Sequence, residues 1–300
     1  MKRIFSIALI AAMMLTVFSV SALADDSSET TSAAAAHAGE ARVVMGADLS
    51  EEQRASVYAM FGIDEGSVTE LTVTNSEERS YLEGIVNDDK IGTNSISCIY
   101  IKLLDSDSGL TVKVNNINWC TEDIYENALM TAGIYDADVI VAAPFEVSGT
   151  AALTGIYKAY EDITGTQLDE SAKEAAVSEL VTTSEIAQEV GDADATTIVN
   201  QLKAILDQTA QMSDDELKTQ IQNFASQDNI TLTDDQISQL ISLVRQLEKM
   251  DTSELVAKVQ SLQNIIKSVS STSSSVTKFF QSVGSFFSKI GDFFAGLFGK

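Results

Sequence analysis

The clearest feature of the hydrophobic pattern is an unbroken apolar run at residues 139–143, followed by a stretch of small residues. The run is short and rich in β-branched side chains, which predicts a strand buried on both faces. Pro144, the single proline of the chain, predicts the end of this strand. The small residues after it predict a helix that packs closely against a sheet. The pattern therefore predicts a folded unit organised around residues 137–160.

Alternating and amphipathic stretches before this run predict further strands and helices. Predicted strands cover residues 42–45, 68–74, 96–104 and 110–117, and predicted helices start close to Ser50, Ser76 and Thr121. The polar turn at residues 105–109 predicts that the strands on either side of it form a hairpin. Strands and helices that alternate in this way favour a mixed sheet covered by helices. The sequence thus predicts a mixed α/β domain over residues 42–165.

The pattern becomes helical after Gly165 and contains few strand-like runs. Two similar segments, near Ser213 and Thr233, each place an apolar residue before a capping box, which predicts the start of two successive helices. Apolar positions at helical spacing favour a helical bundle over residues 166–269. The predicted fold class is therefore α+β: an α/β-type N-terminal domain with a mixed sheet, an all-α helical bundle and an amphipathic C-terminal helix.

A serine-rich joint at residues 270–275 precedes a strongly amphipathic segment at residues 276–300. Its apolar positions recur every three or four residues, which predicts a helix with one aromatic face. The phenylalanines of this face are Phe279, Phe280, Phe286, Phe287, Phe293, Phe294 and Phe298. Such a face is expected to contact a membrane surface or another protein, including a second copy of this chain, or to pack on the bundle. A membrane span is not favoured, because Lys289 and Asp292 lie inside the segment.

The N-terminus has the pattern of a secretory leader. Two basic residues precede an uncharged, largely apolar run at residues 4–20, and small residues follow at Ala22 and Ala24. This order predicts a signal peptide at residues 1–24 that is cleaved after Ala24. A retained membrane anchor is the alternative, although the apolar run is short for a span. We therefore expect a protein that is secreted or associated with the cell surface.

The chain is strongly acidic, with 44 Asp and Glu residues against 19 Lys and Arg and a formal net charge of −25. Removal of the leader takes away two cations and no acids, so the mature chain carries a net charge of −27. No basic stripe interleaved with aromatic residues overrides this field. Nucleic acid is therefore not expected as a partner, and the charge is typical of a protein that stays soluble outside the cell.

Ser148, Gly149 and Thr150 stand where the central predicted strand leads into a helix. Their hydroxyls and backbone N–H groups are therefore candidates for binding a ligand or an anion. A secreted hydrolase with Ser148 or Thr150 as nucleophile is an alternative, and capping of the helix by these hydroxyls is another. The chain has no Gly-x-Ser-x-Gly elbow and no phosphate-loop motif. Binding without catalysis is favoured, and no catalytic residue, metal site or cofactor is predicted.

Residues 25–41 are small and polar and lack periodic apolar positions, which predicts a disordered spacer. This segment holds His37, the single histidine of the chain. An ordered site would therefore lack a histidine base unless the spacer folds back.

Cys98 and Cys120 are the two cysteines and lie near opposite ends of the predicted hairpin. An exported chain favours a disulfide between them, although Cys120 lies about four residues past the position that would face Cys98. A disulfide and two separate thiols are therefore both open. Asp105 and Asp107 in the connecting turn alternate like the start of a calcium loop, but such a loop needs glycine at its sixth position and glutamate at its twelfth, whereas Gly109 is fifth and Asn116 is twelfth.

Several multi-residue blocks resemble one known family. They are Gly46-Ala47-Asp48-Leu49-Ser50, Tyr81-Leu82-Glu83-Gly84, Ile91-Gly92-Thr93 and Ala142-Ala143-Pro144-Phe145, the last of which continues through Val147-Ser148-Gly149-Thr150-Ala151-Ala152-Leu153-Thr154-Gly155-Ile156. Over about residues 40 to 250 the chain is similar to the YpuA-like family of exported bacterial proteins of unknown function. This resemblance implies no mechanism, because the family has no established activity, catalytic residue or ligand. Residues 270–300 lie beyond the matching part.

Overall fold

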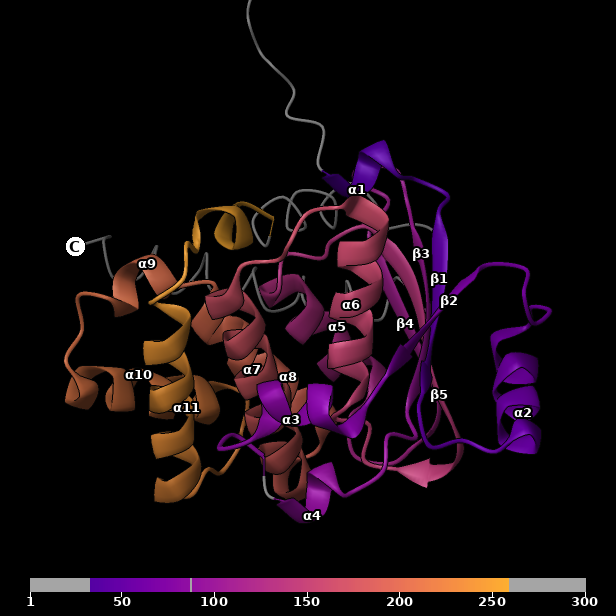
Figure 1. Cartoon of the computed structure of the whole chain (residues 1–300). Coiled ribbons are helices and arrows are strands. Elements are labelled where there is room, and N and C mark those ends of the chain that lie inside the picture. Colours follow the sequence, from indigo (N-terminus) through magenta and orange to yellow (C-terminus); the bar gives the residue numbers. More distant parts are fainter. Residues whose placement is uncertain (1–32, 87, 259–300) are drawn as a thin grey trace, which may run out of the picture. The chain divides into compact units, whose positions relative to one another are not determined.

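A computed structural model describes residues 33–86 and 88–258 of the chain (Figure 1). The predicted signal peptide at residues 1–24, the serine-rich joint at residues 270–275 and the amphipathic segment at residues 276–300 lie outside these residues. Within the described part, mixed strands and helices occupy the N-terminal half and only helices follow, which confirms the predicted α+β class.

Five strands form one mixed sheet. They are β1 (Ala41–Gly46), β2 (Thr69–Val73), β3 (Cys98–Leu103), β4 (Leu110–Ile117) and β5 (Ala137–Val147). Their order across the sheet is β2-β1-β3-β5-β4. β1 runs parallel to β2, β5 runs parallel to β4, and β3 is antiparallel to both of its neighbours. The carboxyl ends of β1, β2, β4 and β5 therefore meet at one edge of the sheet, where β3 begins.

The predicted hairpin of β3 and β4 is wrong, because β5 lies between these two strands. β5 pairs with β3 from Ala137 to Ala142 and with β4 over most of the same length. Its segment from Val139 to Ala143 is almost fully buried apart from Ile140. Such a segment is stable inside the sheet, with a strand on each side and helices over its faces. β4 carries exposed polar residues such as Lys113 and tolerates the edge position.

Helices cover the two faces of the sheet unequally (Figure 1). On one face, α2 (Glu51–Phe61) packs through Val57, Tyr58 and Phe61 against a cluster that includes Met45. On the other face lie α5 (Glu122–Thr131) and α6 (Ala152–Thr164), where α6 contacts β1, β2 and β3 and α5 contacts β4. The second face thus carries the larger core.

The C-terminal helices pack onto this larger core. They are α7 (Glu170–Val190), α8 (Asp192–Lys203), α9 (Leu206–Thr209), α10 (Asp214–Gln227) and α11 (Asp234–Leu247). α7 contacts both α5 and α8, and one continuous buried cluster includes residues of the sheet and of these helices. The capping boxes predicted at Ser213 and Thr233 are confirmed as the starts of α10 and α11.

Residues 33–41, which fall in the predicted disordered spacer, form regular structure. α1 (Ala33–Ala36) is a short helix with Ala34 buried, and it contacts α6. The Gly39 amide donates to the Leu103 carbonyl over 2.8 Å, and the Leu103 amide donates back to the Glu40 carbonyl over 3.0 Å. These backbone bonds extend the sheet beyond β1, so the spacer prediction is wrong for residues 33–41.

Cys98 and Cys120 are free thiols in the structure, and their side chains belong to different cores. Cys98 faces the cluster beneath α2, and Cys120 lies in the cluster on the opposite face of the sheet. The Cys98 thiol accepts a hydrogen bond from the Gly46 amide over 3.5 Å, and the Cys120 sulfur accepts one from Ser184 over 3.7 Å. Burial raises the pKa of Cys98 to about 12. Of the two open possibilities, the structure has the separate thiols, and the hairpin on which the disulfide depended is not formed.

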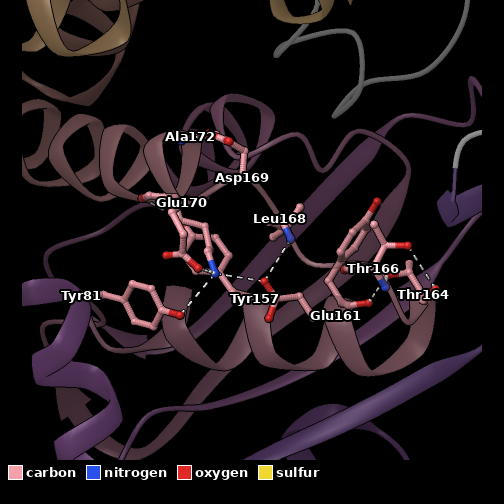
Figure 2. Close-up of polar contacts among 11 residues, drawn as sticks. Tyr81, Tyr157, Glu161, Thr164, Thr166, Leu168, Asp169, Glu170 and Ala172 are labelled. Atoms are coloured by element: carbon pink, nitrogen blue, oxygen red, sulfur yellow. Dashed lines mark hydrogen bonds and ion pairs between the residues drawn. The ribbon is translucent and has the colours of Figure 1, made fainter. Parts of the chain in front are cut away.

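A buried ion-pair cluster fixes α6 against α7 (Figure 2). The Lys173 amine is almost fully buried and lies 3.0 Å from the Glu161 carboxylate and 2.7 Å from that of Glu170. The same amine donates to the Tyr81 hydroxyl over 3.3 Å, which ties in α3 (Asn75–Leu82). A buried cation needs such partners, so these contacts fix the position of α6 relative to its neighbours.

No helix in the part of the chain that the structure describes is both long enough and apolar enough to cross a membrane. Among the same residues, no group of three or more His, Cys, Asp or Glu side chains is arranged to hold a metal ion.

Candidate ligand-binding site

A cavity of about 450 Å³ lies at the edge of the sheet where β4 and β5 end and β3 begins. Its described lining residues are Ile91, Gly92, Thr93, Asn94, Ile96, Ser97, Asn118, Phe145, Glu146, Val147, Ser148, Thr150 and Ala151. They come from three segments: the end of α4 (Asp88–Ile91) with the loop before β3, the residue after β4, and the end of β5 with the turn into α6. Crevices outside the carboxyl ends of strands are where α/β sheets commonly bind ligands, and the volume is within the range of small-molecule sites.

The structure places two of the three predicted site residues in this cavity. Ser148 and Thr150 line it, with their hydroxyl oxygens 3.4 Å apart, and Thr150 is almost fully buried. Neither residue stands at the cap position, since the N-cap residue of α6 is Ala151, which makes no side-chain cap hydrogen bond. The position that the capping alternative gives to Ser148 or Thr150 is therefore taken by Ala151.

Gly149, the third predicted residue, shapes the turn and is absent from the described lining. Its φ is +93°, in the left-handed region that favours glycine. A Cβ at this position would lie 2.5 Å from the Tyr125 hydroxyl and 2.6 Å from Cγ2 of Ile117. The Tyr125 hydroxyl donates to the Gly149 carbonyl over 2.5 Å. Close packing against α5 and β4 thus holds the turn that presents Ser148 and Thr150.

Sequence reasoning missed two lining residues, Ser97 and Phe145. Ser97 is a polar residue that is buried, and Phe145 is an apolar residue that is exposed. Ser97 is 6% exposed and lines the cavity. Phe145 is 49% exposed and is the one exposed large hydrophobic side chain in the described part of the chain. The apolar residue directly after Pro144 was the available signal for Phe145; Ser97 gave none, because it lay inside a predicted strand.

Polar contacts from α3 hold the cavity wall before β3 in place. The Arg79 guanidinium donates to the Gly92 carbonyl over 2.8 Å. The Ser95 hydroxyl donates to the buried Glu78 carboxyl over 2.5 Å, and the Ser95 amide donates to the Asp48 carboxylate over 2.7 Å. The loop at residues 91–97 is therefore fixed at both of its ends.

Burial raises the pKa of the Glu78 carboxyl to about 7, although hydrogen bonds from Ser95 and Asn75 lower it. The nearby Asp48 and Glu77 carboxylates contribute to the rise. In the unfolded chain the pKa of this group returns to the ordinary value of 4.5. The folded state therefore holds the proton more tightly than the unfolded state between these two values, and the free energy of unfolding falls as pH rises through this window.

We expect Glu78→Gln to remove this pH dependence. Relative to the wild type, the variant should gain about 2 kcal/mol in free energy of unfolding between pH 5 and pH 7. Urea denaturation followed by circular dichroism at several pH values measures the difference. Glu77→Gln is the matched control: burial raises the pKa of Glu77, but hydrogen bonds from Lys158 and Thr74 outweigh burial and hold it below its usual value. The control should therefore change stability at acid pH and in the opposite sense, whereas parallel curves for Glu78→Gln and wild type would contradict the expectation.

The charge around the cavity is unlike that of an anion site. Glu146 is the one ionisable side chain among the described lining residues, and no lysine or arginine is found among them. Lys158, further along α6, donates to Glu77 over 2.5 Å and to the Thr72 carbonyl over 2.7 Å. An anion in the cavity would therefore have hydroxyl, amide and backbone donors but no cation from the described lining.

The single histidine lies far from the cavity. His37 precedes Gly39, whose amide bonds Leu103 at the end of β3, whereas the cavity borders the start of β3 near Ser97. The His37 ring contacts the Glu40 carboxylate over 2.8 Å. A base that activates a hydroxyl must come within hydrogen-bond reach of it. His37 therefore cannot activate Ser148 or Thr150 in this arrangement.

The fold and its edge cavity define an α+β protein with a small-molecule-sized site and no histidine base. The chain belongs to the family described as "Protein of unknown function (DUF1002)", whose model matches residues 45–268. It is similar to "Uncharacterized protein YpuA" of Bacillus subtilis (strain 168), with 38% identity over 257 residues that cover 84% of this chain and 83% of the relative. The resemblance to the YpuA-like family is thus confirmed, and the matched residues include all described lining residues of the cavity. No solved structure matches the chain.

Proposed function

We propose that this chain is an exported, non-catalytic binding protein of the cell envelope and that the cavity at the sheet edge is its ligand site. The observation that carries the proposal is the convergence of Ser97, Asn118, Ser148 and Thr150 on one cavity beside the half-exposed Phe145. Concave sites with a few convergent polar groups are typical of ligand binding. The position of the cavity at the carboxyl end of β5 adds to this support.

Binding is favoured over hydrolysis by the chemistry near the two hydroxyls. A serine or threonine nucleophile needs an adjacent base, and His37 lies at the opposite edge of the sheet. The Glu146 carboxylate, the remaining ionisable group of the described lining, is exposed at the end of β5. A hydrolase that uses Ser148 or Thr150 is therefore the less favoured function.

A substitution that fills the cavity tests this proposal. Thr93 is exposed at the cavity rim, so Thr93→Trp should leave the fold intact and block the site. Protein-observed NMR of the mature chain with a library of neutral, anionic and cationic small molecules should give shifts at Ser97, Asn118 and Thr150 in the wild type. These shifts should be lost in Thr93→Trp and kept in Asp105→Trp, which adds the same side chain at the opposite edge of the sheet. Shifts that map elsewhere, or survive in Thr93→Trp, would disprove the assignment.

Export is part of the proposal and rests on the leader pattern of residues 1–24. Expressed with its leader in a bacterial host, the protein should be recovered from the medium or the cell surface. Mass spectrometry of the recovered chain should find Asp25 as its first residue. Intact chain that retains the leader and stays dissolved inside the cell would contradict export.

We also propose that residues 276–300 attach the protein to a membrane surface or to another protein, a second copy of this chain included. The aromatic face of this segment and its position outside the family match support attachment. Co-sedimentation with anionic liposomes should fall at least tenfold when residues 276–300 are deleted. Unchanged lipid binding together with conversion of an oligomer to a monomer would replace the membrane by self-association.

A further inference from the structure

We propose that the cavity takes a neutral, hydroxyl-rich ligand, such as one unit of a glycan, which stacks on Phe145 and hydrogen-bonds to the side chains beneath it. This inference rests on the proposed binding function and specifies the ligand class of the same site. It depends on three properties of the cavity: an exposed aromatic side chain, a set of neutral hydrogen-bonding groups, and the lack of basic residues in the described lining.

Phe145 supplies an apolar surface next to polar groups. Its side chain is 49% exposed and lines the cavity, although the rest of the apolar surface of β5 is mostly buried. The face of an aromatic ring carries partial negative charge, and the C–H groups on one face of a sugar ring carry partial positive charge. A sugar ring laid against Phe145 would therefore cover apolar surface and gain electrostatic attraction, while its hydroxyls stay free to meet polar side chains.

The polar groups of the cavity match a ligand that both donates and accepts hydrogen bonds. Ser97, Ser148 and Thr150 contribute hydroxyls, and Asn94 and Asn118 contribute amides. Each of these side chains can donate and accept, as sugar hydroxyls do. Ser97 is only 6% exposed and lines the cavity, so a ligand hydroxyl that bonds to its side chain would do so where little water competes.

Charge argues against the two ionic alternatives. An anion would enter a site without a lysine or arginine in the described lining, on a chain whose formal net charge is −25. A cation could approach Glu146 and the ring of Phe145, but Glu146 is exposed and the remaining polar lining is uncharged. Transfer of an ion into a site with so little compensating charge is costly, whereas a neutral hydroxyl-rich ligand needs only hydrogen bonds.

The ligand class can be tested by NMR titration of the mature chain with defined probes. N-acetylglucosamine and maltotriose serve as neutral saccharides, and inorganic phosphate and choline serve as the ionic probes. We expect at least one saccharide to shift the amides of Ser97, Asn118 and Thr150, with a dissociation constant on the order of 1 mM. Phosphate and choline should shift them little at the same concentrations.

Three variants test how the saccharide is held. Phe145→Ala should weaken binding about tenfold, and Phe145→Leu, which keeps apolar area but removes the ring, should weaken it several-fold. Ser97→Ala should weaken binding by about three- to tenfold through loss of one hydrogen bond. Because Phe145 is half-exposed, its variants should unfold at the same urea concentration as the wild type, which separates loss of binding from loss of fold.

Each remaining outcome decides against the inference in a different way. Shifts with phosphate or choline but with neither saccharide would overturn the ligand class and leave the cavity as a binding site. Equal saccharide affinity in Phe145→Leu, Phe145→Ala and wild type would overturn the stacking. No shift with these probes or with the wider small-molecule library would remove the proposed function as well.

Discussion

Lys203→Met is expected to lower the free energy of unfolding by about 3–5 kcal/mol, because it leaves the Glu179 carboxylate buried without its cation. Both side chains of this pair are fully buried, and the Lys203 amine lies 2.9 Å from the Glu179 carboxylate. The amine also donates to the Asn127 carbonyl over 3.0 Å, and the Thr131 hydroxyl donates to Glu179 over 2.5 Å. The pair therefore joins α5, α7 and α8 within the core.

Urea denaturation followed by circular dichroism measures this loss, and two further variants make the measurement decisive. Lys203→Met combined with Glu179→Leu removes both charges and should recover most of the lost stability, since apolar replacements of a buried pair are often neutral or better. Lys218→Met breaks an exposed pair with Asp234 and should change stability far less. If Lys203→Met unfolded at the same urea concentration as Lys218→Met, the buried pair would have no special role.

Helices and strands that are specified by residues close together in the sequence could be predicted. Ser50, Ser213 and Thr233 each carry a capping box, and a helix starts at each of them in the structure. A capping box joins residues only three positions apart, so the sequence contains all that the interaction needs. The same holds for β5, whose continuous apolar run specifies burial on both faces whatever its neighbours are.

The order of the strands could not be predicted in this way. The polar turn at residues 105–109 looks like a hairpin turn, but β5 inserts between β3 and β4. Which strand takes the central position depends on the total area buried by all five strands, and no local pattern reports it. The disulfide considered for Cys98 and Cys120 depended on the same hairpin, because it required that the two ends of the hairpin meet.

Some lining residues of the candidate site could be predicted from the sequence, and others could not. Ser148 and Thr150 could be found because a strand that runs into a helix places its connecting residues at a sheet edge. Ser97 and Thr93 join them because β3 starts at the edge where β5 ends, and this follows from the antiparallel pairing of the two strands. Which strands pair is decided by residues far apart in the sequence, so the lining residues before β3 could be found only in the structure.

Gly46→Ala is expected to destabilise the protein by about 3 kcal/mol and to disturb the cavity wall. A Cβ at Gly46 would lie 2.3 Å from the carbonyl oxygen of Ser95 and 2.6 Å from its carbonyl carbon. The obstacle is backbone, so no side-chain rotation can relieve it. Ser95 can retreat only by loosening its contacts with Glu78 and Asp48, which hold the loop at residues 91–97.

The matched control for this substitution is Gly155→Ala, in the interior of α6. Its Cβ would approach side-chain atoms alone, the nearest being Cγ1 of Ile99 at 3.3 Å, and alanine favours a helix over glycine by about 1 kcal/mol. These effects oppose each other, so the control should change the free energy of unfolding little. Urea denaturation gives both stabilities, and NMR shifts at Ser97 report the cavity wall. Equal stability of the two variants would contradict the close approach at Gly46, whereas a loss confined to Gly46→Ala together with altered Ser97 shifts would tie the end of β1 to the shape of the site.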